Sequence, residues 1–237
     1  MSAIGSVSMV IIFYTFLFFS LGRIVQKITS VSTESYIISI PIGFITYWSI
    51  TQLLYMPFVA FGVSINVLSI IEIAKNAFIV ILIAANYDSI INFKKIRNIE
   101  TWKSFSIFLL SFLSLLFLVQ FSFLGSNFQV NTTGIESQLN NEIISNSVST
   151  SIGINILDDQ GAELAYSANS FYFFESVTLN LTNADLYTFN AWYINYFFIL
   201  STMLTSIYVS SFYFKGNQIW FTSIIMTIVF IIISIFS

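Results

Sequence analysis

Residues 66–97 read NVLSIIEIAKNAFIVILIAANYDSIINFKKIR and carry the strongest signal for the fold of this chain. The first part, residues 66–91, is apolar at most positions and exceeds the roughly 20 residues that a membrane-crossing helix needs. Lys94, Lys95 and Arg97 follow directly, and Lys103 lies just beyond. Because basic loops stay on the cytoplasmic side of a membrane, this stretch predicts a transmembrane helix that ends in the cytoplasm.

The composition of the whole chain excludes a water-soluble domain. Of its 237 residues, 57% are hydrophobic and 8% are charged, and the mean hydropathy is +0.86. Soluble domains carry about 25% charged residues. The chain has no Cys and no His, which excludes disulfides, thiol nucleophiles and His-ligated metals. We therefore expect no cofactor and no metal site, and a pI near 4.8 disfavours nucleic acid as a partner.

Apolar runs divide the sequence into six candidate transmembrane helices. These runs cover residues 4–21, 36–61, 66–91, 104–124, 189–214 and 218–236. The second run contains Pro41 and Pro57, so we expect a kink or an early helix end near Pro57. The predicted fold class is an all-α membrane protein with about six transmembrane helices and one extracytoplasmic loop domain between the fourth and fifth.

The basic residues predict how these helices are oriented. Arg23 and Lys27 follow the first run and Lys215 follows the fifth, whereas residues 104–214 contain no Lys or Arg. The positive-inside rule then places both termini outside the cytoplasm, with helices in residues 1–124, an extracytoplasmic domain in 125–188 and helices in 189–237. The plasma membrane of a bacterium is the expected location, and a mitochondrial inner membrane remains an alternative.

Two charged residues interrupt the third run. Glu72 and Lys75 are three positions apart, which places them on one side of a helix and predicts an ion pair. Charges inside a membrane are costly and are often functional. We expect both to lie near the outer interface, where the Lys side chain extends towards water. A structural pair, a contact to a partner subunit and an ion or substrate path are the three interpretations. Asp88, at the other end of this run, is expected to be a solvated residue at the interface.

The predicted outer domain has one helical pattern and one acidic cluster. From residue 161 onward, apolar residues recur every three or four positions at Leu164, Ala168, Phe171, Phe174 and Val177. The expected helix lies along the bilayer surface or packs on the mouth of the helix bundle. The acidic residues are Asp158, Asp159, Glu163 and Glu175. Asp158 and Asp159 suit a general base or a cation ligand, and the alternative is helix capping with solvation.

Two segments of the second run resemble a known group of proteins. Residues 42–48, IGFITYW, and residues 52–58, QLLYMPF, are similar to the early helices of uncharacterised bacterial multi-spanning envelope proteins. Those proteins resemble the GT-C glycosyltransferases, which use polyprenyl-phosphate sugar donors on the outer side of the membrane. The resemblance implies that Asp158–Asp159 match the acidic pair that opens an outer-loop helix in that group. It also allows a reduced relative that has kept the scaffold and lost catalysis.

The sequence leaves three classes of function open. The first expectation is a non-catalytic membrane subunit that anchors or assembles a larger envelope complex through its helices and outer loop. The second is a GT-C-like glycosyltransferase with Asp158 or Asp159 as base. The third is a transporter or channel component that uses Glu72 and Lys75. The expected partners are the lipid bilayer, other membrane proteins and, for the second class, a polyprenyl-phosphate lipid.

Overall fold

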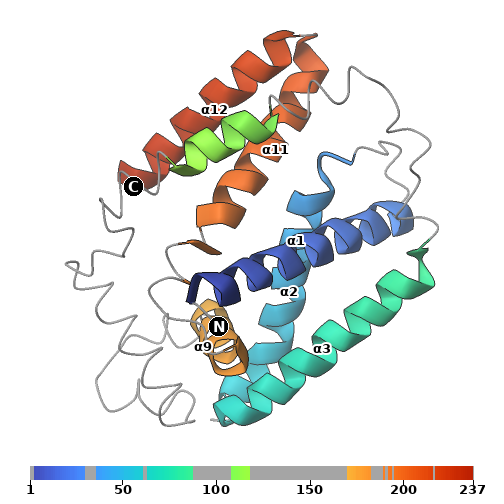
Figure 1. Cartoon of the computed structure of the whole chain (residues 1–237). Coiled ribbons are helices and arrows are strands. Elements are labelled where there is room, and N and C mark those ends of the chain that lie inside the picture. The colour runs from blue at the N-terminus through green and yellow to red at the C-terminus, as the bar shows by residue number, and fades with distance from the viewer. Residues whose placement is uncertain are drawn as a thin grey trace.

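The computed structural model of the chain describes residues 3–29, 36–60, 63–87, 108–117, 170–182, 189, 192–193, 195–215 and 217–236, and their regular structure is helical throughout. The helices are α1 (Ala3–Ile28), α2 (Ser39–Ala60), α3 (Ile65–Ala85), Phe108–Phe117, α9 (Ser170–Thr182), α11 (Asn195–Tyr213) and α12 (Asn217–Phe236). Figure 1 shows their arrangement. The predicted all-α class is thus confirmed for the residues that the structure describes.

Three of these helices are long and apolar enough to cross a membrane. They are residues Gly5–Ile28 of α1, the whole of α3 and the whole of α11. The structure is therefore compatible with an integral membrane protein, while six spans and a separate loop domain stay predictions. The helix α1 continues past Leu21 to Ile28, so Arg23 and Lys27 lie in its last turns and not in a loop.

The two prolines of α2 lie near its two ends. Pro41 is the third residue of α2, in the first turn, where the backbone N–H has no helical partner. Pro57 lies inside the helix, which ends three residues later at Ala60. The helix therefore continues past Pro57 to within one residue of the end of the predicted run.

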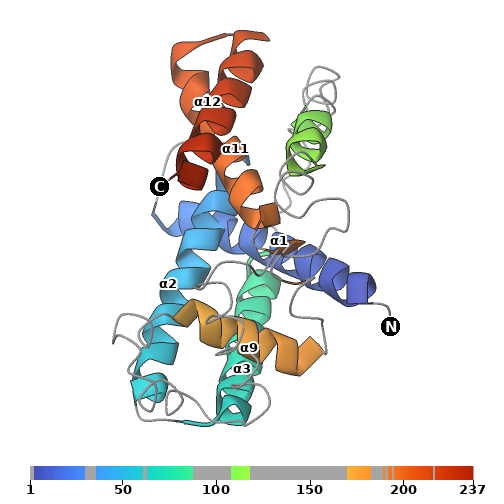
Figure 2. The same cartoon turned by 90° about the vertical axis from the view of Figure 1, so that its left-hand side faces the viewer.

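Two glycines allow α1 and α2 to cross in close contact. A Cβ atom at Gly22 of α1 would overlap the carbonyl oxygen of Ser39, and one at Gly43 of α2 would overlap that of Phe18. Only glycine leaves room for two helix backbones at this separation. Figures 1 and 2 show that α2 crosses α1 and does not run alongside it.

The short helix α9 completes the core formed by α1, α2 and α3. It packs against α2 and α3, and every side chain from Phe173 to Leu179 is buried. An amide-to-hydroxyl hydrogen bond of 3.2 Å joins Asn180 of α9 to Ser69 of α3. Of the two expected positions for a helix here, packing on the bundle is therefore the one observed. A helix buried on all sides does not lie on a bilayer surface.

A second core lies between the helix Phe108–Phe117 and α11. Phe112, Leu115 and Leu116 pack there against Met203 and other buried residues of α11. The helix α12 packs against α11 and forms a hairpin with it. In both views the turn of this hairpin points away from α1, α2 and α3 (Figures 1 and 2).

Candidate functional site

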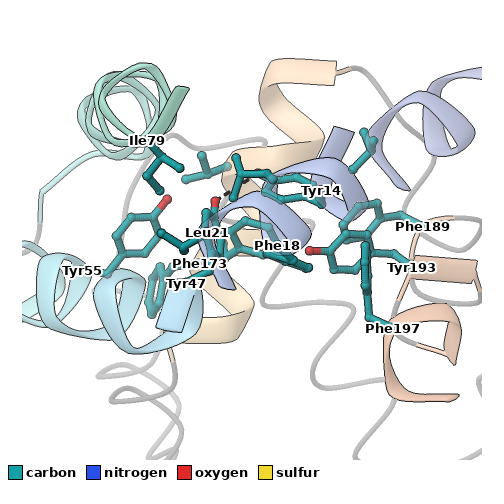
Figure 3. Packing of buried hydrophobic residues seen from close by; sticks show 14 of the residues in the cluster. Tyr14, Phe18, Leu21, Tyr47, Tyr55, Ile79, Phe173, Phe189, Tyr193 and Phe197 are labelled. Carbon is teal, nitrogen blue, oxygen red and sulfur yellow. Dashed lines mark hydrogen bonds between the residues drawn. The ribbon is translucent and has the colours of Figure 1, made fainter. Parts of the chain in front are cut away.

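The polar centre of the core surrounds the carboxylate of Glu72, which is 1% exposed. Its Oε1 atom accepts hydrogen bonds from the hydroxyls of Tyr14, at 3.2 Å, and Tyr47, and from the side-chain amide of Asn76 at 3.1 Å. Its Oε2 atom accepts from the hydroxyl of Tyr55 at 2.6 Å. Three tyrosines from two other helices therefore converge on one carboxylate of α3. Figure 3 shows these three rings among the neighbouring core residues.

Lys75 provides the charge that balances Glu72. Its Nζ atom lies 2.7 Å from Oε2 of Glu72 and donates to the hydroxyl of Thr51 at 2.7 Å. The same atom lies 4.0 Å from the ring centroid of Tyr47, close enough for a cation–π interaction. The ion pair expected from the spacing of Glu72 and Lys75 is present. The expectation that Lys75 extends towards water is wrong, because Glu72, Thr51 and the Tyr47 ring hold the ammonium group inside the core.

Helical spacing explains how three helices deliver these side chains. Tyr47, Thr51 and Tyr55 are four positions apart on α2, and Glu72, Lys75 and Asn76 lie within one turn of α3. Residues three or four apart share one face of a helix. Tyr14 reaches the same point from α1. We call this group the Glu72 cluster, and it comprises Tyr14, Tyr47, Thr51, Tyr55, Glu72, Lys75 and Asn76.

The Glu72 cluster is closed to further ligands. A carboxylate has about four lone-pair sites, and five donors already surround Glu72. Phe174 of α9 packs on the cluster, with its ring centroid 5.5 Å from that of Tyr14 and 5.9 Å from Nζ of Lys75. Complete pairing is what allows two charges to stay in an apolar core. The geometry thus favours the structural interpretation of the pair.

A second buried carboxyl group lies on the adjacent residue of α9. Glu175 is 1% exposed, and its Oε1 atom has no hydrogen-bond partner among the described residues. The hydroxyls of Thr178 and Tyr193 are likewise buried without a partner there. Burial raises the pKa of Glu175 well above its ordinary value of 4.5, because the charged form loses its hydration. The expectation that Glu175 belongs to a solvated acidic cluster is therefore wrong.

Most of the other predicted residues lie outside the part of the chain that the structure describes. These are Asp88, Lys94, Lys95, Arg97, Lys103, Asp158, Asp159 and Glu163. Lys27 and Lys215 are described and exposed. Arg23 is half-buried, with its guanidinium 4.3 Å from the ring centroid of Tyr36. Within the described residues, no group of three or more acidic side chains is placed to bind a metal ion.

Sequence reasoning identified the ion pair and missed the tyrosines around it. The sequence does contain a signal for these tyrosines, because a charge pair inside an apolar helix needs donors and acceptors from neighbouring helices. The spacing of Tyr47, Thr51 and Tyr55 is the pattern that supplies them.

Comparisons with protein-family models, curated proteins and solved structures gave no match. The resemblance to GT-C-like envelope proteins therefore stays an expectation.

Proposed function

We propose that this chain is a non-catalytic membrane subunit that anchors or assembles a larger complex. The observation that carries this proposal is the closed Glu72 cluster, in which the donors that surround Glu72 come from the chain itself. A catalytic or transport site needs polar groups that can reach a substrate. The buried charges of α3 instead join α1, α2 and α3 into one unit, which suits a scaffold.

The hairpin of α11 and α12 supports contacts with other membrane proteins. Phe221, Ile225 and Phe230 of α12 are exposed, although α12 packs on α11. In a membrane such side chains meet lipid tails or the helices of a partner, and packing against a partner gains van der Waals contacts. The hairpin turn points away from α1, α2 and α3 (Figure 2). We assign the partner-binding surface to α12.

Purification of the tagged full chain in a mild detergent, followed by mass spectrometry, tests this function. We expect a membrane protein that co-purifies in fixed stoichiometry. The double substitution Phe221→Ala with Ile225→Ala should lose that protein. The control Ile70→Ala removes an exposed side chain from α3 and should retain it. A monodisperse chain with no bound protein would contradict the proposal.

Proton or ion transfer is a second candidate, and the buried Glu175 favours it. This carboxyl group has no described partner and lies beside Phe174, which covers the Glu72 cluster. Buried carboxyls near hydroxyl groups are found in proton pathways. The test is proton flux into liposomes that contain the purified chain. Unchanged flux in the variant Glu175→Gln, compared with wild type, would remove this candidate.

A further inference from the structure

An apolar groove runs beside the Glu72 cluster. It has a volume of about 510 Å³, and its lining includes Leu21 of α1, Leu54 and Phe58 of α2, and Ile71, Ala74 and Leu82 of α3. Lys75 also borders it, but its ammonium is bound by Glu72 and Thr51. Only the alkyl part of this side chain is therefore available to the groove. The volume lies in the range of about 300–1,000 Å³ that is typical of sites for small organic ligands.

The length of the groove matches one leaflet of a bilayer. From Ile71 to Leu82, α3 rises by about 16 Å at roughly 1.5 Å per residue. The hydrocarbon core of a bilayer is about 30 Å thick, so one leaflet contributes about half of that. A single acyl chain has this length, and it has no polar group that the groove would leave without a partner. The dimensions and the chemistry of the groove therefore fit one lipid tail.

A basic side chain lies just beyond one end of the groove. The backbone of Asn86 bonds to Leu82, one helical turn away, and Nζ of Lys27 lies 3.5 Å from the side-chain oxygen of Asn86. Lys27 is exposed, and an ammonium group has three donors, so it can bind a further acceptor. The predicted orientation places this end at the cytoplasmic leaflet, which is the leaflet rich in anionic lipids. The charge complements a lipid phosphate.

We propose that the groove binds one acyl chain of an anionic phospholipid from the cytoplasmic leaflet, with Lys27 contacting the headgroup phosphate. This site is separate from the partner surface on α12, so either can exist without the other. Phosphatidylglycerol is a suitable probe, and zwitterionic phosphatidylcholine with the same tails is its control. Retention of either lipid tests whether the groove binds an acyl chain. A preference for phosphatidylglycerol over phosphatidylcholine tests whether Lys27 contacts the headgroup phosphate.

Native mass spectrometry of the purified full chain, in micelles with equal amounts of the two lipids, measures retained lipid. Wild type should retain one phosphatidylglycerol in preference to phosphatidylcholine. Lys27→Gln should lower that preference about fivefold, the effect of one basic residue near a membrane surface. Lys215→Gln removes an exposed lysine from the α11–α12 turn and should leave the preference unchanged.

A second experiment tests the groove itself by filling it with a tryptophan side chain. Ala74 and Ala77 are both exposed on α3, but only Ala74 lines the groove. Ala74→Trp should lose both lipids, whereas Ala77→Trp should bind them as wild type does. Equal helicity of the two variants by circular dichroism shows that the fold is kept. Wild-type lipid retention by Ala74→Trp, or equal retention of the two lipids by wild type, would overturn the proposal.

Discussion

Among the described residues, Lys75 is the one basic side chain that is buried. Lys75→Met leaves the Glu72 carboxylate inside the core without its counter-charge, which costs about 3–5 kcal/mol of unfolding free energy. The double variant Glu72→Gln with Lys75→Met removes both charges, and we expect it to recover much of that loss. Thermal unfolding in detergent, followed by tryptophan fluorescence, measures both effects.

The matched control for Lys75 is the same substitution at an exposed position. Lys215→Met lies at the end of α11, where the ammonium group is solvated, and should change the unfolding temperature little. Equal losses from Lys75→Met and Lys215→Met would mean that the Glu72 cluster contributes nothing to stability.

The buried carboxyl group of Glu175 makes the free energy of unfolding depend on pH. Its pKa is raised in the folded chain by burial, while in the unfolded chain it titrates near 4.5. Between these two values the folded state holds one proton more than the unfolded state. Stability therefore falls as pH rises above about 4.5, by at most about 1.4 kcal/mol per pH unit from this group. Below pH 4.5 both states are protonated and Glu175 has no effect.

The variant Glu175→Gln isolates this contribution, because an amide does not titrate. Its unfolding temperature should exceed that of wild type at neutral pH, and the difference should shrink as the pH is lowered towards 4.5. A difference that stays constant between pH 4.5 and pH 8 would show that Glu175 is not a buried neutral acid. Unfolding scans of both proteins across this range supply the measurement.

At the level of single helices, the crossing of α1 and α2 depends on Gly22 and Gly43. Gly43→Ala places a methyl group onto the backbone of α1 at Phe18, so the two helices must move apart. We expect a loss of about 1–3 kcal/mol, the usual cost of overpacking. Leu53→Phe adds volume on the same helix at a side chain that is 74% exposed, and it should be nearly neutral. Unfolding in detergent compares the two.

The helices that the sequence predicted well are those in long apolar runs. The run at residues 36–61 corresponds to α2, and the one at 218–236 corresponds to α12, each to within about three residues. The position of α9 could not be predicted, because its apolar face fits a bilayer surface and a protein core equally well. Its buried Glu175 was missed for the same reason, since sequence spacing does not show which helices become neighbours. The Gly22–Gly43 contact likewise joins two segments whose proximity only the fold establishes.

On the scale of the whole molecule, the absence of cysteine makes the predicted orientation directly testable. Single cysteines at Lys215 and at Asn131 would be the only thiols in their chains. We expect a membrane-impermeant maleimide to label Asn131→Cys in intact cells, and to label Lys215→Cys only after the membrane is opened. The expectation follows from the distribution of Lys and Arg. Labelling of Lys215→Cys in intact cells would show that the orientation is the opposite of the predicted one.

The position of α9 in the core also constrains how this protein is made. Phe174 packs beside Lys75, yet it leaves the ribosome after about a hundred more residues, which takes roughly 5–20 s at typical rates of synthesis. During that interval α1, α2 and α3 are complete but one side of their charged centre is uncovered. The core formed by α1, α2 and α3 therefore cannot be completed until α9 has been synthesised and docks beside Lys75.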